Sequence, residues 1–208
     1  MSLDVKPAFY AAAAIFISLT GIACSGGSAA GSGGYGNGDP NLAASNPGGG
    51  PISPFLADGQ AVLRALDAVE TRSGKPLRVT SITSDRSNGL MVDVQEPAHP
   101  FNVDAYTVAP DGTLSGPAPV KLMSLSGGPI TVKDVDDKAF DPRAVGFGHL
   151  AATAREAIAK SNYSDARVSE WDFAGIHPDD RRFMYLDSAR ARPTAELGPH
   201  LNVVAVRF

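Results

Sequence analysis

Hydrophobic residues recur at helical spacing between residues 57 and 72. Val62, Leu66 and Val69 fall on one face of this stretch, and charged residues occupy the opposite face. Asp58 can cap the first turn through its carboxylate, and a Ser-Gly-Lys-Pro sequence after the stretch provides the stop. The pattern therefore predicts an amphipathic helix over residues 57–72.

Short segments with the features of β-strands follow this helix. Apolar and polar positions alternate in residues 89–95, which predicts a strand with one face on a core and the other toward solvent. An Asp-Gly pair at residues 111–112 predicts a hairpin turn. The expected strands are residues 77–84, 89–95, 102–109 and 119–125.

A second helix and a second set of strands are expected in the C-terminal part of the chain. Phe147, Leu150, Ala154 and Ile158 share one helical stripe within residues 147–161. Segments of strand character separated by turn-forming residues follow this stripe. The strands expected there are residues 166–173, 182–188 and 201–208.

The two parts share their order of elements and some of their patterning. Residues 103–108 resemble residues 201–206, for example, in the spacing of their apolar side chains. The sequence therefore predicts an α+β fold in which two helix-then-antiparallel-strands repeats form a sheet with the helices packed on one face. Leu66 and Ile158 should then occupy comparable buried positions.

The N-terminal 54 residues are expected to lie outside this globular part. An uncharged run from Ala8 to Ala23 follows Lys6, which is the layout of a secretory signal peptide. The Gly, Ser and Pro residues that come next offer too little apolar surface to build a core, so they predict a flexible tether. The expected units are residues 1–23 as signal peptide, 24–54 as tether, 55–128 as first repeat and 129–208 as second repeat.

The end of the apolar run resembles the lipobox of bacterial lipoproteins. Residues 19–25 read Leu-Thr-Gly-Ile-Ala-Cys-Ser, so that Cys24 follows a small residue. The resemblance implies acylation of Cys24, with palmitate as a typical chain, and a lipid anchor in a membrane of the cell envelope, with the domain facing the periplasm or the outside. Gly21 departs from the Leu-like residue that the motif favours. Because Gly21, Ile22 and Ala23 also fit the site of ordinary signal peptidase, release of the chain remains the alternative.

Composition excludes several classes of protein. The chain has 208 residues, with 18 Lys and Arg against 22 Asp and Glu, and its basic residues form no continuous stripe. A nucleic-acid partner is therefore not expected. Cys24 is the single cysteine, which excludes an internal disulfide, a zinc ribbon, an iron-sulfur site and a cysteine nucleophile in the globular part.

The globular part, residues 55–208, resembles the PepSY-like and beta-lactamase-inhibitor-protein-like folds. The stretch Val103–Leu114 is similar to the strand, Asp-Gly turn and strand that close a PepSY unit. The second half departs from this pattern because Phe208 ends the chain without a matching Asp-Gly hairpin. The resemblance implies a protein that binds or inhibits other proteins through its sheet face.

No residue pattern indicates a metal, a cofactor or a catalytic group. The acidic stretch beginning at Asp134 lacks the oxygen ligand, glycine and glutamate of an EF-hand at Lys138, Ala139 and Val145, so a solvated connector is expected. No two of the four histidines have the i, i+4 spacing of a zinc helix. Neither a Gly-x-Ser-x-Gly nor a Ser-x-x-Lys motif occurs.

Aromatic residues on expected strands are the candidates for contact with a partner. They are Trp171, Tyr185 and Tyr106, with Trp171 the best single candidate for a binding hot spot if it is exposed. Strict alternation places Val168 on the opposite strand face from Trp171. The strand must therefore contain a bulge or expose one of these two side chains.

The sequence favours a non-enzymatic envelope lipoprotein that binds or inhibits a partner through an exposed sheet face. That partner would be an unidentified envelope or extracellular protein or a cell-wall component. The alternative is a secreted or anchored hydrolase with a loop-built site near His177, Asp179 and Asp180. A pocket in which a histidine meets a carboxylate would favour the enzyme.

Overall fold

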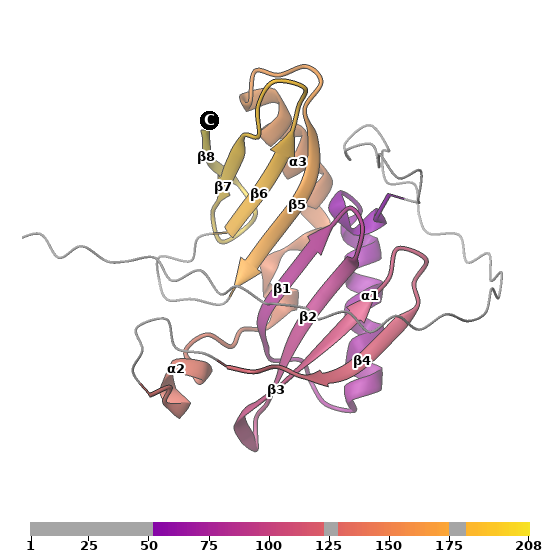
Figure 1. The fold of residues 1–208 in the computed structure, drawn as a ribbon, viewed down its shortest axis with the longest axis vertical. Coiled ribbons are helices and arrows are strands. Elements are labelled where there is room, and N and C mark those ends of the chain that lie inside the picture. The colour runs from indigo at the N-terminus through magenta and orange to yellow at the C-terminus, as the bar shows by residue number, and fades with distance from the viewer. Residues whose placement is uncertain (1–51, 123–128, 175–181) are drawn as a thin grey trace, which may run out of the picture.

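A computed structural model describes residues 52–122, 129–174 and 182–208. These residues form an α+β fold with one antiparallel sheet of eight strands in the order β4-β3-β2-β1-β5-β6-β7-β8 (Figure 1). The helices are α1 (Gly59–Ser73), α2 (Val132–Asp136) and α3 (Leu150–Lys160), with short 3-10 turns η2 (Pro54–Leu56), η3 (Pro142–Val145) and η4 (Phe147–His149). The strands are β1 (Val79–Asp85), β2 (Gly89–Glu96), β3 (His99–Val108), β4 (Leu114–Pro119), β5 (Arg167–Ala174), β6 (Arg182–Asp187), β7 (Thr194–Leu197) and β8 (Val203–Arg207).

Helix α1 forms as its sequence pattern predicts. The Asp58 carboxylate accepts hydrogen bonds from the backbone N–H groups of Gln60 and Ala61, at 2.9 and 3.1 Å. At the other end, Gly74 adopts a left-handed conformation with φ of 69°, and its N–H donates to the Glu70 carbonyl. Both ends of the predicted helix are confirmed to within about two residues.

The second helix is shorter than its apolar stripe. Gly146 ends η3 with φ of 80°, the chain makes the turn η4, and α3 begins only at Leu150. A close backbone approach fixes η4 against α1, because a Cβ atom on Gly59 would lie 1.7 Å from the Phe147 carbonyl oxygen. Phe147 is therefore buried in the core as part of the turn η4, and not as part of the predicted helix.

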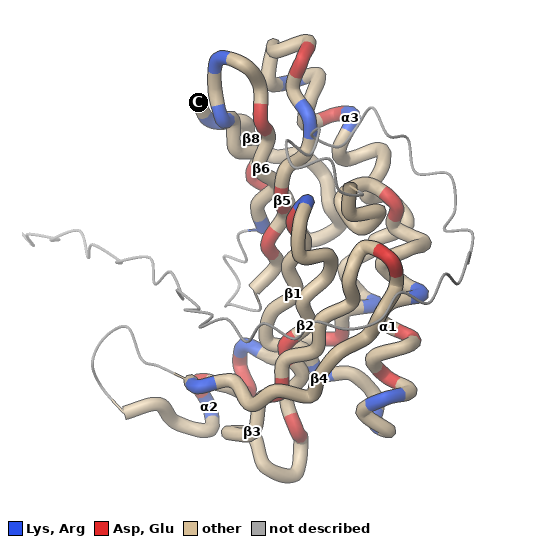
Figure 2. Tube along the Cα trace, turned by 45° about the vertical axis from the view of Figure 1, so that its right-hand side comes forward, with Lys and Arg blue, Asp and Glu red and all other residues tan. Residues whose placement is uncertain are grey.

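Strands β1 and β5 join the two parts of the chain at the centre of the sheet. They pair antiparallel, with Ile82 opposite Phe173 and Ser84 opposite Trp171. From this pair, β2 to β4 continue outward on one side and β6 to β8 on the other. Helices α1 and α3 lie on the same face of the sheet (Figure 1), whereas α1 and α2 lie on opposite sides (Figure 2).

Aromatic side chains fill the core between the sheet and the two longer helices. The rings of Trp171 and Phe173 stack at 4.7 Å, and Phe147 packs at 5.6 and 5.8 Å from them. Leu66 on α1 is fully buried, but Ile158 on α3 is only half-buried. The expectation that these two positions are comparable is therefore wrong, because α3 buries its N-terminal turns more deeply than its end.

Two strands differ from the sequence prediction. Strand β4 occupies residues 114–119 instead of residues 119–125, and β7 was not expected at all. Strand β7 has four residues with one small and one large apolar side chain, which is too weak a pattern to identify a strand. It pairs with β8 in a hairpin in which the Gly198 N–H donates to the Asn202 carbonyl at 2.8 Å. The second half therefore does end in a hairpin, although without an Asp-Gly turn.

The two segments whose sequences resemble each other occupy different positions in the two halves of the sheet. Residues 103–108 belong to β3, the third strand of the first half, whereas residues 203–206 belong to β8, the fourth strand of the second. The similarity between residues 103–108 and 201–206 is therefore a similarity between strands in different positions. Short strands share alternating apolar patterns whatever their place in a sheet, which explains the error.

The acidic connector before α3 is more ordered than a solvated linker. Thr131 and Asp134 form a reciprocal capping box at the start of α2, and Val135 is buried. Asp136 accepts a hydrogen bond from the Gln95 side chain at 2.8 Å. The acidic side chains of this stretch therefore cap and tether α2 beside the sheet.

Truncating Leu66 to Ala should lower the free energy of unfolding by about 2 to 5 kcal/mol, because the side chain is fully buried beneath the sheet. Ile158→Ala should cost clearly less than Leu66→Ala, since the Ile158 side chain is only partly buried. The exposed Arg155→Ala is the control and should stay within about 0.5 kcal/mol. Chemical denaturation of the three variants measures this order, and equal losses at Leu66 and Ile158 would contradict the packing described.

Candidate functional site

Three carboxylates lie on the sheet face opposite α1 and α3. Strand register places Asp93 of β2 across from Ser81 of β1, and Asp172 of β5 across from Thr83 of β1. Glu170 lies two residues before Asp172 on β5 and shares its face. Because the alternate residues of these strands fill the core, the acidic side chains point away from it.

Burial and mutual repulsion disturb the protonation of this group. Burial, followed by the charge of Asp172, raises the pKa of Asp93 to about 6. Burial also raises the pKa of Asp172, and burial with the neighbouring Asp85 and Asp172 raises the pKa of Glu170. Clustered, displaced carboxyl pKa values of this kind are typical of functional sites, although they also occur in structural networks.

Two aromatic rings border the carboxylates on β6. Phe183 lies opposite Asp172 and Tyr185 lies opposite Glu170, and the two ring centres are 6.2 Å apart. Both side chains are half-buried. Burial, then the charges of Asp172 and Glu170, raises the pKa of the Tyr185 hydroxyl. We call Asp93, Glu170, Asp172, Phe183 and Tyr185 the acidic patch.

Other charges near this patch have partners within the chain. Asp187 binds Arg86 at 3.3 Å and Arg192 at 2.8 Å. Glu196 binds Arg207 at 2.7 Å. These ion pairs contrast with Asp93, Glu170 and Asp172, whose side chains make no hydrogen bond or ion pair with another described residue.

The structure changes the candidate contacts drawn from the sequence. Trp171 is 0% exposed, and its indole N–H donates to the Phe55 carbonyl at 3.0 Å, so it packs in the core instead of facing a partner. Tyr106 is also buried. A register shift between Val168 and Glu170 confirms the bulge alternative and lets Val168 and Trp171 both point inward. Of the three aromatics, only Tyr185 belongs to the acidic patch.

Two of the sites expected from the sequence lie outside the described residues. The acylation candidate Cys24 lies outside the described residues, as do His177, Asp179 and Asp180 of the hydrolase alternative. Within the described ranges, no group of three or more His, Cys, Asp and Glu side chains is arranged to hold a metal ion. No helix in those ranges is long and apolar enough to cross a membrane.

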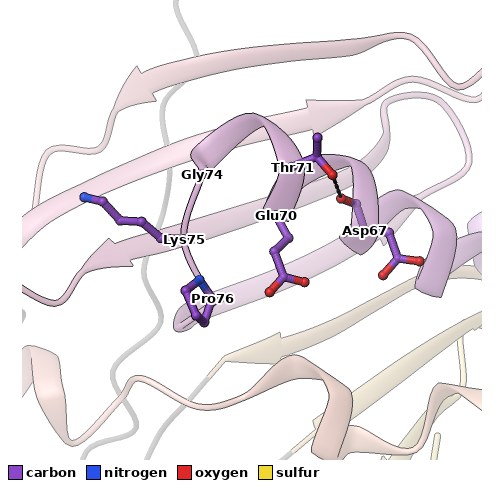
Figure 3. Close-up of a pocket in the computed structure, with 6 residues that line it drawn as sticks. All are labelled: Asp67, Glu70, Thr71, Gly74, Lys75 and Pro76. Carbon is purple, nitrogen blue, oxygen red and sulfur yellow. Dashed lines mark hydrogen bonds between the residues drawn. The ribbon is translucent and has the colours of Figure 1, made fainter.

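A depression of about 390 Å³ lies beside the C-terminal end of α1 (Figure 3). Figure 3 shows the Asp67 and Glu70 carboxylates on one side of the helix and Lys75 pointing away from them. Both carboxylates bind Arg143 of η3, with 2.9 Å between Arg143 and Asp67. This arrangement ties α1 to the connector before α3, and its lining contains no histidine.

Comparisons with known proteins add one structural similarity. No family model matches the chain, and no curated protein matches it by sequence. Among solved structures, a provisionally assigned lipoprotein of Clostridium difficile 630 is similar, with 12% sequence identity and a TM-score of 0.47. The similarity covers 74% of this chain and 93% of that chain.

Sequence reasoning missed the three carboxylates. The alternation of Asp93 with Val92 and Val94 was visible as a half-exposed strand, but such a pattern does not reveal which strand lies beside it. Asp172 alternates with Trp171 and Phe173 in the same way. Neither signal identifies the carboxylates as neighbours, because β2 and β5 are brought together only by β1.

Replacing Asp93 by Asn should change how stability depends on pH. Since the pKa of Asp93 is raised above the unfolded value of 3.8, the folded state binds this proton more tightly than the unfolded chain does. The resulting stabilisation is complete below about pH 4 and is lost as pH rises through about 6. Asp93→Asn should therefore stabilise the protein at pH 7.5 by about 1 to 3 kcal/mol relative to the wild type.

Denaturation at several pH values tests this expectation. Asp104→Asn, at a half-exposed carboxylate on β3, is the matched control and should not reproduce the pH-dependent difference. A difference between Asp93→Asn and wild type that stays flat from about pH 4 to 7 would show that Asp93 is not held in a proton-retaining environment.

Proposed function

We propose that this protein is an envelope-anchored lipoprotein whose folded domain binds another protein through the sheet face opposite α1 and α3. The sequence supports the anchoring through its signal-peptide pattern, the Ala-Cys pair at residues 23–24 and the Gly-rich stretch behind it. The single observation that carries the binding role is the acidic patch, where unpaired carboxylates and two aromatic rings share one sheet face.

The topology supports a duplicated unit. Each half runs from a helix to four antiparallel strands, α1 to β4 in the first half and α3 to β8 in the second. The first strand of each half lies at the centre, and the later strands follow outward in order. We propose that the halves are two copies of one α+β unit of the PepSY-like or beta-lactamase-inhibitor-like kind, joined through β1 and β5.

Binding through this face has a physical rationale. A carboxylate that is buried without a partner destabilises the folded protein, and a complementary group on a second protein can offset that cost. Aromatic side chains such as Tyr185 supply a large contact area with little loss of conformational freedom, which is why they are enriched at interfaces. The patch also spans β2 to β6, so a partner would contact both halves.

A photo-crosslinking amino acid at position 185 should capture a specific partner in cells that export the full chain. The matched control carries the same group at position 155, an exposed position on α3 that faces away from the patch. We expect the Tyr185 variant to yield a discrete cross-linked protein that the Arg155 variant does not, as identified by mass spectrometry. Identical cross-linked species from both positions, or species from position 155 alone, would contradict binding through the sheet face.

Acylation predicts a defined mass for the mature chain. Intact mass spectrometry should show a protein that begins at Cys24 and carries a thioether-linked lipid, because the lipobox resemblance places the modified thiol there. Cys24→Ser is the control and should remove the lipid mass. A mature wild-type chain that begins at Cys24 without added lipid mass would show that ordinary signal peptidase cleaves it and that the domain is released.

A further inference from the structure

We propose that the acidic patch binds an arginine side chain presented by the partner protein. This inference rests on the proposed function and names the chemistry of the contact. The guanidinium group would lie between Asp93 and Asp172, with Glu170, Phe183 and Tyr185 around it. It follows from the strand geometry, from the missing partners of the carboxylates, and from the rings beside them.

Strand geometry leaves room for a planar cation between the carboxylates. Adjacent strands lie about 4.8 Å apart, so β2 and β5, on either side of β1, are separated by about 10 Å. Asp93 and Asp172 are also offset by two residues along β1, because Asp93 faces Ser81 and Asp172 faces Thr83. On this face, β1 contributes only the small hydroxyl side chains of Ser81 and Thr83 between Asp93 and Asp172. Two carboxylates that flank a strand of small residues can both reach one guanidinium group, whose donors point outward in a fixed fork.

Asp93 and Asp172 lack partners among the described residues although they are largely withdrawn from solvent, whereas Glu170 is exposed. Asp93 is only 9% exposed, and among the described residues none donates a hydrogen bond to its side chain or forms an ion pair with it. The Asp172 Oδ1 atom is buried and likewise has no hydrogen-bond partner. An isolated buried carboxylate costs free energy, whereas a charge-assisted pair with a donor returns part of that cost. The side chains are therefore poised to accept hydrogen bonds from an incoming cation.

The composition of the patch favours an organic cation over a metal ion. Metal sites gather several oxygen or nitrogen ligands at short range, and no such group occurs in the described part of the chain. Phe183 and Tyr185 instead place two ring faces or edges beside the carboxylates, and aromatic rings attract guanidinium groups through cation–π contacts. Arginine uses both kinds of contact at once because its planar group stacks on rings and binds carboxylates bidentately.

Nearby arginines of the chain are engaged with other acids. Arg86 and Arg192 both bind Asp187, and Arg207 binds Glu196 at the C-terminal side of the sheet. Their ion pairs lie on the strands and turns that border the patch. Within the described ranges, these arginines therefore leave Asp93 and Asp172 without a cationic partner.

A labelled tetra-arginine peptide provides a direct test with the full chain purified in a neutral detergent. Fluorescence anisotropy should show binding, and a tetra-citrulline peptide of the same length, which lacks the charge, should bind at least about tenfold more weakly. Asp93→Asn and Asp172→Asn should each weaken binding of the arginine peptide by about tenfold or more. Glu156→Gln, at an exposed acid on α3, is the matched control and should leave the affinity within about twofold.

Three results would overturn the inference. They are equal affinity for the arginine and citrulline peptides, unchanged affinity in both Asp variants, and stoichiometric calcium chloride binding that displaces the peptide. A thermal unfolding curve for each variant verifies that the fold is retained. Introducing Asp172→Asn into the position-185 cross-linking variant separates the two proposals. If the variant that carries Asp172→Asn still captures the partner equally well, the sheet-face function stands and the arginine contact is wrong. If the position-185 variant without Asp172→Asn captures no partner, the sheet-face function itself is wrong.

Discussion

The antiparallel pairing of β1 with β5 is the constraint on which the rest of the structure depends. It joins two sheets of four strands into one and places Ile82 beside Phe173 and Ser84 beside Trp171 at the centre. Trp171 then stacks on Phe173, contacts Phe147 of η4 and donates its indole N–H to Phe55. Both longer helices are thereby held to one face (Figure 1), whereas polar side chains and α2 lie on the opposite side (Figure 2).

The same pairing creates the electrostatic problem on the opposite face. Asp93 and Asp172 are distant in the chain, and they come close enough for the charge of Asp172 to raise the pKa of Asp93 only because β1 lies between β2 and β5. Asp85 and Glu170 are placed directly opposite each other by the same register, which is unfavourable for like charges. Asp85 is relieved by the backbone N–H groups of Ser87 and Asn88 in its own turn. Glu170 accepts no such backbone hydrogen bonds from the described residues, and burial followed by the charge of Asp85 raises its pKa.

The carboxylates therefore lower stability at this face, and the proposed binding would offset that cost. A protein selected only for stability would gain from amides in place of these carboxylates, because an amide carries no charge to desolvate. Retaining acids beside aromatic rings makes sense if a cationic partner satisfies them in the complex. The tether proposed from the sequence would hold the domain away from a lipid surface, so that a partner protein could reach the sheet face.

The sequence by itself determined the features that depend on local physics. Helix α1 with its Asp58 cap, strands β2 and β3, and the α+β class all follow from short-range periodicity and spacing. The export and acylation of the chain stay predictions from the sequence. Strand β7, the true range of β4 and the burial of Trp171 did not, because short strands acquire their identity from their neighbours and a bulge reverses the face of a side chain. The acidic patch was decided only by tertiary structure, since no local pattern records that β1 lies between Asp93 and Asp172.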